Sequence, residues 1–368
     1  MADTIKSSSI RIEYFDLLKG IAIFLVVMGH VLTMCIRDID SAFTFKIISE
    51  VHMPLFFFIS GYLTYKASQT KTFLKPDLWK RFKQLIIPFV IVSALWIWYF
   101  PHSRLQSPIS DNIIDMYQSY WKDGYWFTLC LFEIFVVYYP LSMLLSKVKN
   151  AGFQIILTVA VYTGLIIFAQ FVSSPAENKD LIGAGLLASF FPVFMIGVFA
   201  SKYKDNFSAI IKSNIWFIAG IFIFVICWYY TVYFWEFPML PDWTNLITRP
   251  LEHFGLIIIA ITAIQPWSKK EFNSEPGNKP STVARYFKFI GQESLAIYLI
   301  HYFFLFPLTP LQEPLKNIGL PMVPLLTISI IVAFMVIAIT LLVNYIIQRN
   351  KYLSFLLIGK DSANRKQR

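Results

Sequence analysis

Long apolar runs, separated by short polar connections, fill most of the chain. A helix needs about 20 residues to cross a bilayer, and ten of these runs approach or exceed that length. The pattern predicts an all-α, polytopic integral membrane helical bundle of about ten transmembrane helices. The predicted spans are residues 13–36, 44–65, 85–101, 125–146, 152–172, 181–200, 214–235, 245–265, 286–306 and 322–347.

Lysine and arginine are distributed unevenly among the connections. If the N-terminus is cytoplasmic, 24 of them lie in the segments on the inner side and six in the segments on the outer side. Positive charge favours the cytoplasmic side of a membrane protein, so this bias predicts a multi-pass chain with both termini in the cytoplasm.

Composition supports the membrane class and excludes others. Hydrophobic residues make up 57% of the chain and charged residues only 15%, against about 25% charged in soluble domains. The net charge of +10 is spread between spans rather than gathered in one patch, which argues against a nucleic-acid partner. The three cysteines, Cys35, Cys130 and Cys227, form no CxxC pair, so we expect neither a disulfide framework nor a metal site.

The spans leave little room for other domains. Residues 71–84 (KTFLKPDLWKRFKQ) are basic with interspersed apolar side chains, a pattern that predicts an amphipathic helix on the inner membrane surface. The polar stretch at residues 268–281, which contains proline and glycine, predicts a flexible loop. We expect one transmembrane domain over residues 1–355, with its first helix retained, and a short basic cytoplasmic tail over residues 356–368.

Three ionisable residues interrupt the first span: Asp16, Lys19 and His30. On an ideal helix, residues 11 positions apart point within about 20° of each other and lie roughly 16 Å apart along the axis. One helix face therefore carries Lys19 near one membrane surface and His30 nearer the other, and Asp16 can pair with Lys19 one turn away. A snorkelling lysine and a histidine hydrogen-bonded to a neighbouring helix are the structural alternative.

Polar residues also recur in the predicted outer halves of other spans. Four of the five histidines share this depth, accompanied by carboxylates and one arginine. Their convergence predicts a polar cavity that opens outward, although polar residues also join helices by hydrogen bonds. The set comprises His30, Glu50, His52, Glu133, Arg249, Glu252, His253 and His301.

Spacing adds detail at both ends of this region. Ser294, Tyr298 and His301 line one helix face, so a hydroxyl could orient the imidazole, or the three could form an ordinary interhelical stripe. At the cytoplasmic end, Lys19 with Arg11 could hold phosphate groups. The positive-inside rule already explains why surface positions such as Arg81 are basic. Lys19 is therefore the residue on which the prediction of phosphate binding rests.

Three motifs resemble those of the acyltransferase 3 family of bacterial membrane acyltransferases. They are FDLLKGIAIFLVVMGH in the first span, HMPLFFFISGY at residues 52–62, and SLAIYLIH at residues 294–301. Lys19 stands where many members of the family have arginine, and the lysine form is common in the branch that resembles sugar O-acetylases. His30 matches the family histidine. The resemblance covers the membrane domain in span number and motif order.

The resemblance implies a membrane O-acyltransferase in a bacterial plasma membrane. It implies transfer from cytosolic acyl-CoA, usually acetyl-CoA, to a hydroxyl of a glycan or lipid-linked sugar, without a permanently bound cofactor or metal. His30 would act as general base, with His301 as the second catalytic candidate. An acyl-histidine intermediate is an alternative. Donor-binding candidates are Lys19, Asp16 and Arg11, and acceptor or cavity-lining candidates are His52, Glu50, Glu133, Arg249, His253, Ser60 and Tyr298.

Two other classes compete with this interpretation. A transporter of a small polar or sugar compound also uses intramembrane His, Glu and Arg, but the two halves show no matching broken helices and the polar residues cluster toward one side rather than at the midplane. A membrane-embedded binding or sensory protein is the third possibility.

Overall fold

The structure is a computed structural model, and it describes most of the chain. The described ranges are 13–35, 42–65, 74–99, 109–119, 121–174, 179–180, 182–235, 245–272, 279–308, 310 and 322–360. Nearly all of these residues are helical, and the strands are limited to a two-residue antiparallel pair, β1 (Ser173–Ser174) with β2 (Lys179–Asp180). The expected all-α membrane bundle is confirmed.

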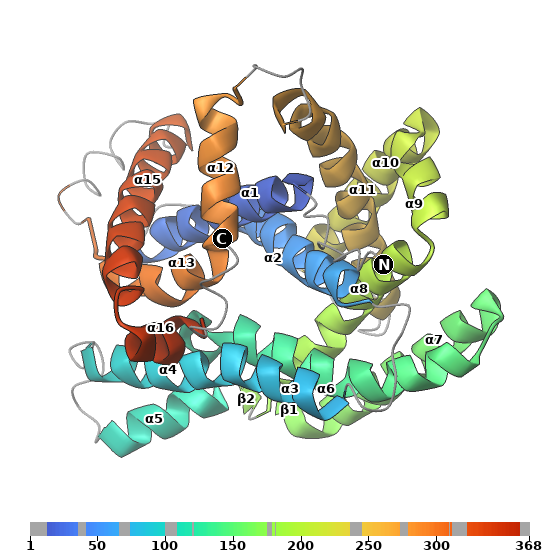
Figure 1. The fold of residues 1–368 in the computed structure, drawn as a ribbon, viewed down its shortest axis with the longest axis horizontal. Coiled ribbons are helices and arrows are strands. Elements are labelled where there is room, and N and C mark those ends of the chain that lie inside the picture. The colour runs from blue at the N-terminus through green and yellow to red at the C-terminus, as the bar shows by residue number, and fades with distance from the viewer. Residues whose placement is uncertain are drawn as a thin grey trace, which may run out of the picture.

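The first helix, α1 (Glu13–His30), is the centre of the bundle, and a π-helical turn, η1 (Val31–Cys35), continues it. It packs against α2 (Ala42–Thr64), α11 (Asn245–Phe272), α12 (Thr282–Gln292), α13 (Ser294–Ile300) and α15 (Met322–Ile347). In Figure 1, α1 and α2 lie in the middle, with α15 on one side and α11 on the other. Residues of this helix therefore face several others at once.

Small residues allow the central helices to approach closely. A side chain on Gly291 of α12 would place its Cβ 1.9 Å from the carbonyl oxygen of Asp16, and one on Gly20 would meet the Phe287 carbonyl at the same distance. Close backbone approach through small residues is the usual way in which membrane helices pack, because lipid supplies little hydrophobic drive. These contacts fix α1 against α12.

The segment predicted as a surface helix is part of a longer helix. α3 (Leu74–Arg81) continues through a π-helical turn, η3 (Phe82–Ile86), into α4 (Ile87–Tyr99), and residues 76–99 together are long and apolar enough to span a membrane. The amide of Ile87 donates to the carbonyl of Phe82, five residues back. Such a turn accommodates Pro88, which lacks an amide hydrogen for a regular helical bond.

Other elements lie around these central helices. α4, α6 and α7 run along one edge of the view in Figure 1. The remaining elements are α5 (Ile109–Gln118), η5 (Lys122–Gly124), α6 (Trp126–Lys147), α7 (Ala151–Val172), α8 (Ala184–Lys202), α9 (Lys204–Lys212), α10 (Asn214–Trp235), η8 (His301–Phe304) and α16 (Lys351–Ile358).

Among the described residues, seven helices are long and apolar enough to cross a membrane, or eight if the bent pair α9 and α10 forms one span. When the bent pair is counted, two of the ten predicted spans lie outside this count. The predicted span 44–65 corresponds to α2, which has 23 residues. The predicted span 286–306 is divided into α12, α13 and η8. The division falls at Glu293, which is buried and bonded to α15 and to Lys360, beyond α16.

Candidate active site

On α1, Lys19 and Asp16 form the predicted ion pair. Lys19 Nζ lies 2.8 Å from Asp16 Oδ1, and the Lys19 side chain is 22% exposed while Asp16 is nearly buried. Gln292 of α12 also donates to Asp16. Arg11, the third predicted donor-binding residue, lies outside the described residues. The lysine therefore sits at the edge of the bundle, held by a buried carboxylate.

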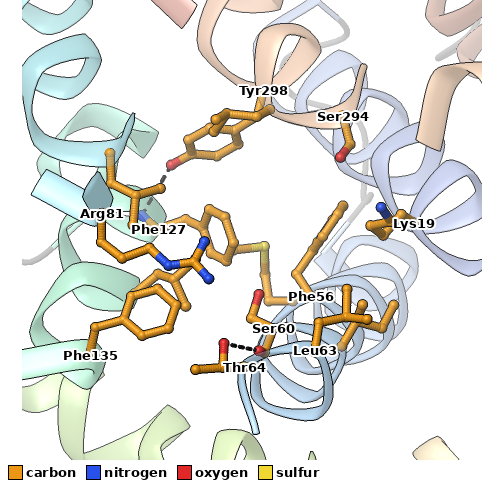
Figure 2. A pocket seen from close by; sticks show the side chains of 15 residues that line it. Lys19, Phe56, Ser60, Leu63, Thr64, Arg81, Phe127, Phe135, Ser294 and Tyr298 are labelled. Atoms are coloured by element: carbon orange, nitrogen blue, oxygen red, sulfur yellow. Dashed lines mark hydrogen bonds between the residues drawn. The ribbon is translucent and has the colours of Figure 1, made fainter. Parts of the chain in front are cut away.

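A cavity of about 290 Å³ opens beside Lys19. Figure 2 shows Lys19 and Arg81 approaching it from opposite sides, with Tyr298 at a further edge. Apart from these groups and a few hydroxyls, the walls are apolar. The lining residues are Lys19, Met53, Phe56, Ile59, Ser60, Leu63, Thr64, Arg81, Leu85, Phe127, Leu131, Phe135, Ser294, Leu295 and Tyr298.

Arg81 is the residue that the sequence interpretation set aside. Its guanidinium carbon lies 4.6 Å from the centre of the Phe135 ring, a cation–π contact that directs it over α6. The pattern gave no reason to distinguish it from neighbouring surface cations such as Lys80, because all of them sit where the positive-inside rule places charge. Only the packing of α3 against α6 shows that Arg81 lines the cavity.

Tyr298 joins the cavity to the start of α6. Its hydroxyl donates to the carbonyl oxygen of Gly124 at 2.6 Å and accepts from the amide of Phe127 at 3.1 Å. The hydroxyl thus joins α13 to the start of α6 by hydrogen bonds. It does not orient His301, as one sequence-based alternative suggested. Ser294, one turn earlier, lines the same cavity.

One turn beyond Tyr298, the rings of His301, Tyr302 and His30 form a cluster. The ring centres lie 5.4 Å apart for His30 and His301, 4.7 Å for His30 and Tyr302, and 4.3 Å for His301 and Tyr302. The Tyr302 hydroxyl is 2.7 Å from His30 Nε2. The structure therefore brings the two predicted catalytic histidines together and adds a tyrosine that spacing did not single out.

The surroundings of His301 fix its tautomer. Its Nδ1 lies 2.8 Å from the Ile297 carbonyl and 2.9 Å from the Tyr298 carbonyl. Because carbonyl oxygens only accept hydrogen bonds, Nδ1 carries the hydrogen, and the neutral ring has its lone pair on Nε2. That nitrogen is buried and has no hydrogen-bond partner among the described residues. His301 is fully buried, whereas His30 is partly exposed.

A second polar cluster joins α2 to α11. Arg249 contacts Glu50 at 2.5 Å, and His253 Nε2 lies 3.7 Å from the other Glu50 oxygen. The His253 ring also stacks on Phe190 of α8, with the planes 10° apart. His52 is buried on α2, two residues after Glu50. Glu50, Arg249 and His253 thus come together, but the cavity beside Lys19 is lined by none of them. Of the predicted cavity-lining residues, Ser60 and Tyr298 line that cavity.

Glu133 lies apart from that cluster. Its carboxylate faces Gly183, where an added Cβ would be 2.8 Å from Glu133 Oε2, and its charged neighbours are Lys122 and Asp180. Lys122, in the turn before α6, is buried and donates to the Ser119 and Asp180 carbonyls. Burial lowers the pKa of Lys122, opposed by the charges of Asp180 and Glu133. Through Lys122 and Glu133, the turn and α6 are thus tied to residues 180–183, just before α8.

Comparison with known proteins places this geometry in a family. A family model described as an acyltransferase domain, that of acyltransferase 3, matches residues 12–347. The chain belongs to the acyltransferase 3 family. The resemblance drawn from the three motifs is confirmed at the level of the family.

Two curated relatives match part of this acyltransferase 3 chain. The nodulation protein NolL of Mesorhizobium japonicum is 37% identical over 117 residues, which are 29% of this chain and 31% of the relative. The NolL protein of Sinorhizobium fredii is 35% identical over 116 residues, with the same shares. The matches thus span about a third of the length of these relatives. No solved structure matches the chain at a significant level.

Proposed function

We propose that this acyltransferase moves an acetyl group from cytosolic acetyl-CoA to a hydroxyl of a cell-surface glycan or lipid-linked sugar. We place it in the plasma membrane of a bacterium, with both termini in the cytoplasm. Acetyl-CoA binds as a co-substrate in each cycle, and coenzyme A leaves. The alternative of a transporter has no support from the family match, which is to an enzyme domain.

The observation that carries the proposal is the cavity between Lys19 and Arg81. Coenzyme A bears phosphate groups, and arginine and lysine are the usual phosphate ligands, arginine through a bidentate fork. Both cations stand on the side that the charge bias predicts to be cytoplasmic. The apolar walls beyond them, from Met53 to Phe135, suit the aliphatic part of an acyl-CoA arm.

From the cavity, the path of the acyl group leads toward the histidines. Tyr298 lines the cavity, and its carbonyl bonds to His301, whose ring neighbours His30. In the proposed reaction His30 Nε2–H donates to the Tyr302 oxygen, and the Nδ1 lone pair takes the proton of the acceptor hydroxyl. The acceptor oxygen attacks the thioester carbonyl. The bond from carbon to sulfur then breaks, and the coenzyme A thiolate leaves and takes up a proton.

We assign the base role to His30 because it is partly exposed, so a substrate can reach it. His301 is the second candidate, since its Nε2 lone pair is available. It is fully buried, however, and would meet a substrate only if its neighbours moved. Covalent acyl transfer through a histidine is the other route that this pair permits.

The Glu50–Arg249–His253 cluster is the proposed acceptor site. Carboxylate, guanidinium and imidazole groups together can accept from and donate to sugar hydroxyls. Glu50 and Arg249 are each partly exposed, at 18% and 29% of the side chain, so they remain reachable. His52 is buried on the same helix, two residues after Glu50. Glu133, which faces Lys122, takes no part in this site.

The experiment is an assay of purified protein in detergent with acetyl-CoA labelled in the acetyl group. Glycan and glycolipid extracts of the cell envelope serve as acceptors. The proposal predicts covalent label on the acceptor and an equal amount of free coenzyme A thiol. No label on the acceptor and no thiol release in detergent, with uptake of glycan by vesicles that contain the same protein, would overturn it in favour of transport.

A further inference from the structure

Tyr302 occupies a defined place between the two histidines. Its hydroxyl meets His30 Nε2 at 2.7 Å, and its ring contacts both His30 and His301. The side chain is only 2% exposed, packed against Trp96 and Tyr125. A hydrogen bond to one ring nitrogen opposes rotation of an imidazole, so Tyr302 restricts which way the His30 ring turns.

The turn before α6, residues 122–124, lies against the Tyr302 hydroxyl. Gly124 has a φ of +94°, a conformation that favours glycine. A Cβ added there would lie 1.9 Å from the Tyr302 hydroxyl oxygen and 2.4 Å from the ring carbon that bears it. Any other residue at this position would therefore push Tyr302 away from His30.

This turn is itself held on several sides. The Lys122 ammonium donates to the Ser119 carbonyl at 2.9 Å and to the Asp180 carbonyl. The Tyr298 hydroxyl donates to the Gly124 carbonyl. Tyr298 and Tyr302, one turn apart, thus both contact Gly124. Gly124 therefore contacts one residue that lines the cavity and one that is bonded to His30.

We propose that Tyr302 is the positioning residue of His30 and that Gly124 keeps its hydroxyl in place. The inference rests on the proposed function, because it assigns a partner to the base of that reaction. Tyr302 is buried and acts through His30 rather than on the substrate. Small misplacements of a catalytic group are costly, on the order of 10²-fold in rate for about 1 Å.

Tyr302→Phe tests the inference by removing the hydroxyl and leaving the ring. The expected result is a fall in kcat of about 10²-fold, measured by release of coenzyme A thiol with cell-envelope glycan extract as acceptor. The KM for acetyl-CoA, its Kd and the thermal midpoint should stay at the wild-type values. A structural role would move the midpoint or the affinity together with the rate.

Tyr125→Phe is the matched control. It removes a hydroxyl from a ring whose centre lies 5.0 Å from that of Tyr302, and it leaves the bond between Tyr302 and His30 in place. This variant should keep the wild-type kcat. Gly124→Ala should lower kcat as Tyr302→Phe does, and the double variant should lose little more than either alone, because both act through one hydrogen bond.

Three results would overturn the positioning role. They are a wild-type kcat in Tyr302→Phe, a loss of rate matched by a loss of acetyl-CoA affinity or thermal stability, and an equal loss in Tyr125→Phe. Each of them leaves transfer by the wild-type protein intact. Absence of transfer by the wild-type protein overturns the proposed function, and this inference falls with it, so the two failures are distinguishable.

Discussion

At the scale of single residues, the account depends on His30. The first span alone placed it on one face with Lys19, and the structure adds its contacts with Tyr302 and His301. His30→Gln keeps size and hydrogen-bonding capacity but cannot take up the proton. We expect it to insert and fold normally and to lose roughly 10²–10⁴-fold in kcat, measured by thiol release.

A matched comparison keeps this prediction specific. His253→Gln, in the proposed acceptor cluster, should raise the KM for the acceptor more than it lowers kcat, because it removes binding rather than proton transfer. Near wild-type turnover in folded His30→Gln would show that the base is another group, and His301 would then be the first to test.

Donor binding gives a second prediction at this scale. Arg81→Ala and Lys19→Ala should each weaken acetyl-CoA binding by about tenfold or more, since a charge-assisted contact with a phosphate contributes about 1.5–3 kcal/mol. Lys19→Arg should bind normally because the charge is kept. The measurement is the Kd by calorimetry in detergent.

Lys80→Ala is the control for that series. Lys80 precedes Arg81 on α3, is exposed and does not line the cavity, so the same change of charge should leave the Kd unaltered. Equal weakening in Lys80→Ala and Arg81→Ala would mean that general surface charge, rather than a site, attracts the donor.

At the scale of elements, hydropathy predicted the helices well because a membrane helix must be apolar over its length. The division of residues 286–306 was missed. Glu293 stands where α12 ends and α13 begins, and it is bonded by Asn344, Gln348 and Lys360. These partners lie more than 50 residues away in the chain, so no local pattern could predict that the carboxylate is satisfied there.

Some residues of the site were also predictable from the sequence, and others were not. The relation of Lys19 to His30 follows from helix geometry and was predictable. Arg81 and Tyr302 became visible only through tertiary contacts, with Phe135 in one case and with His30 and Gly124 in the other. The single signal for Tyr302 was its position next to His301, which a spacing argument does not use.

Packing of α1 against α12 gives a prediction about stability. Gly291→Ala would bring a Cβ to 1.9 Å from the Asp16 carbonyl, and backbone atoms cannot move aside as a flexible side chain can. We expect a destabilisation of about 1–3 kcal/mol, seen as a lower thermal midpoint in detergent.

Gly164→Ala is the matched control for this change. It lies within α7, where an added Cβ would meet no atom within 4 Å, and alanine favours helix over glycine. Its thermal midpoint should equal or slightly exceed that of the wild type. If Gly291→Ala were equally stable, the close crossing of α1 and α12 would be wrong.

At the scale of the whole molecule, the charge bias predicts that both termini are cytoplasmic. A reporter that is active only in the cytoplasm, fused after Arg368, should be active, and one that is active only outside should be silent. The opposite pair of results would invert the proposed direction of transfer, because the cavity between Lys19 and Arg81 would then face away from cytosolic acetyl-CoA.

The central claim is that the acyl donor enters at Lys19 and Arg81 on the cytoplasmic side and meets its acceptor at the histidines on the other. Inverted membrane vesicles, whose cytoplasmic face points outward, test it directly. Cell-envelope glycan extract is enclosed in the vesicles, and labelled acetyl-CoA is added outside. The account predicts label on the enclosed glycan with wild-type protein and almost none with His30→Gln. No label on the enclosed glycan with the wild-type protein, or equal labelling by the two proteins, would contradict it.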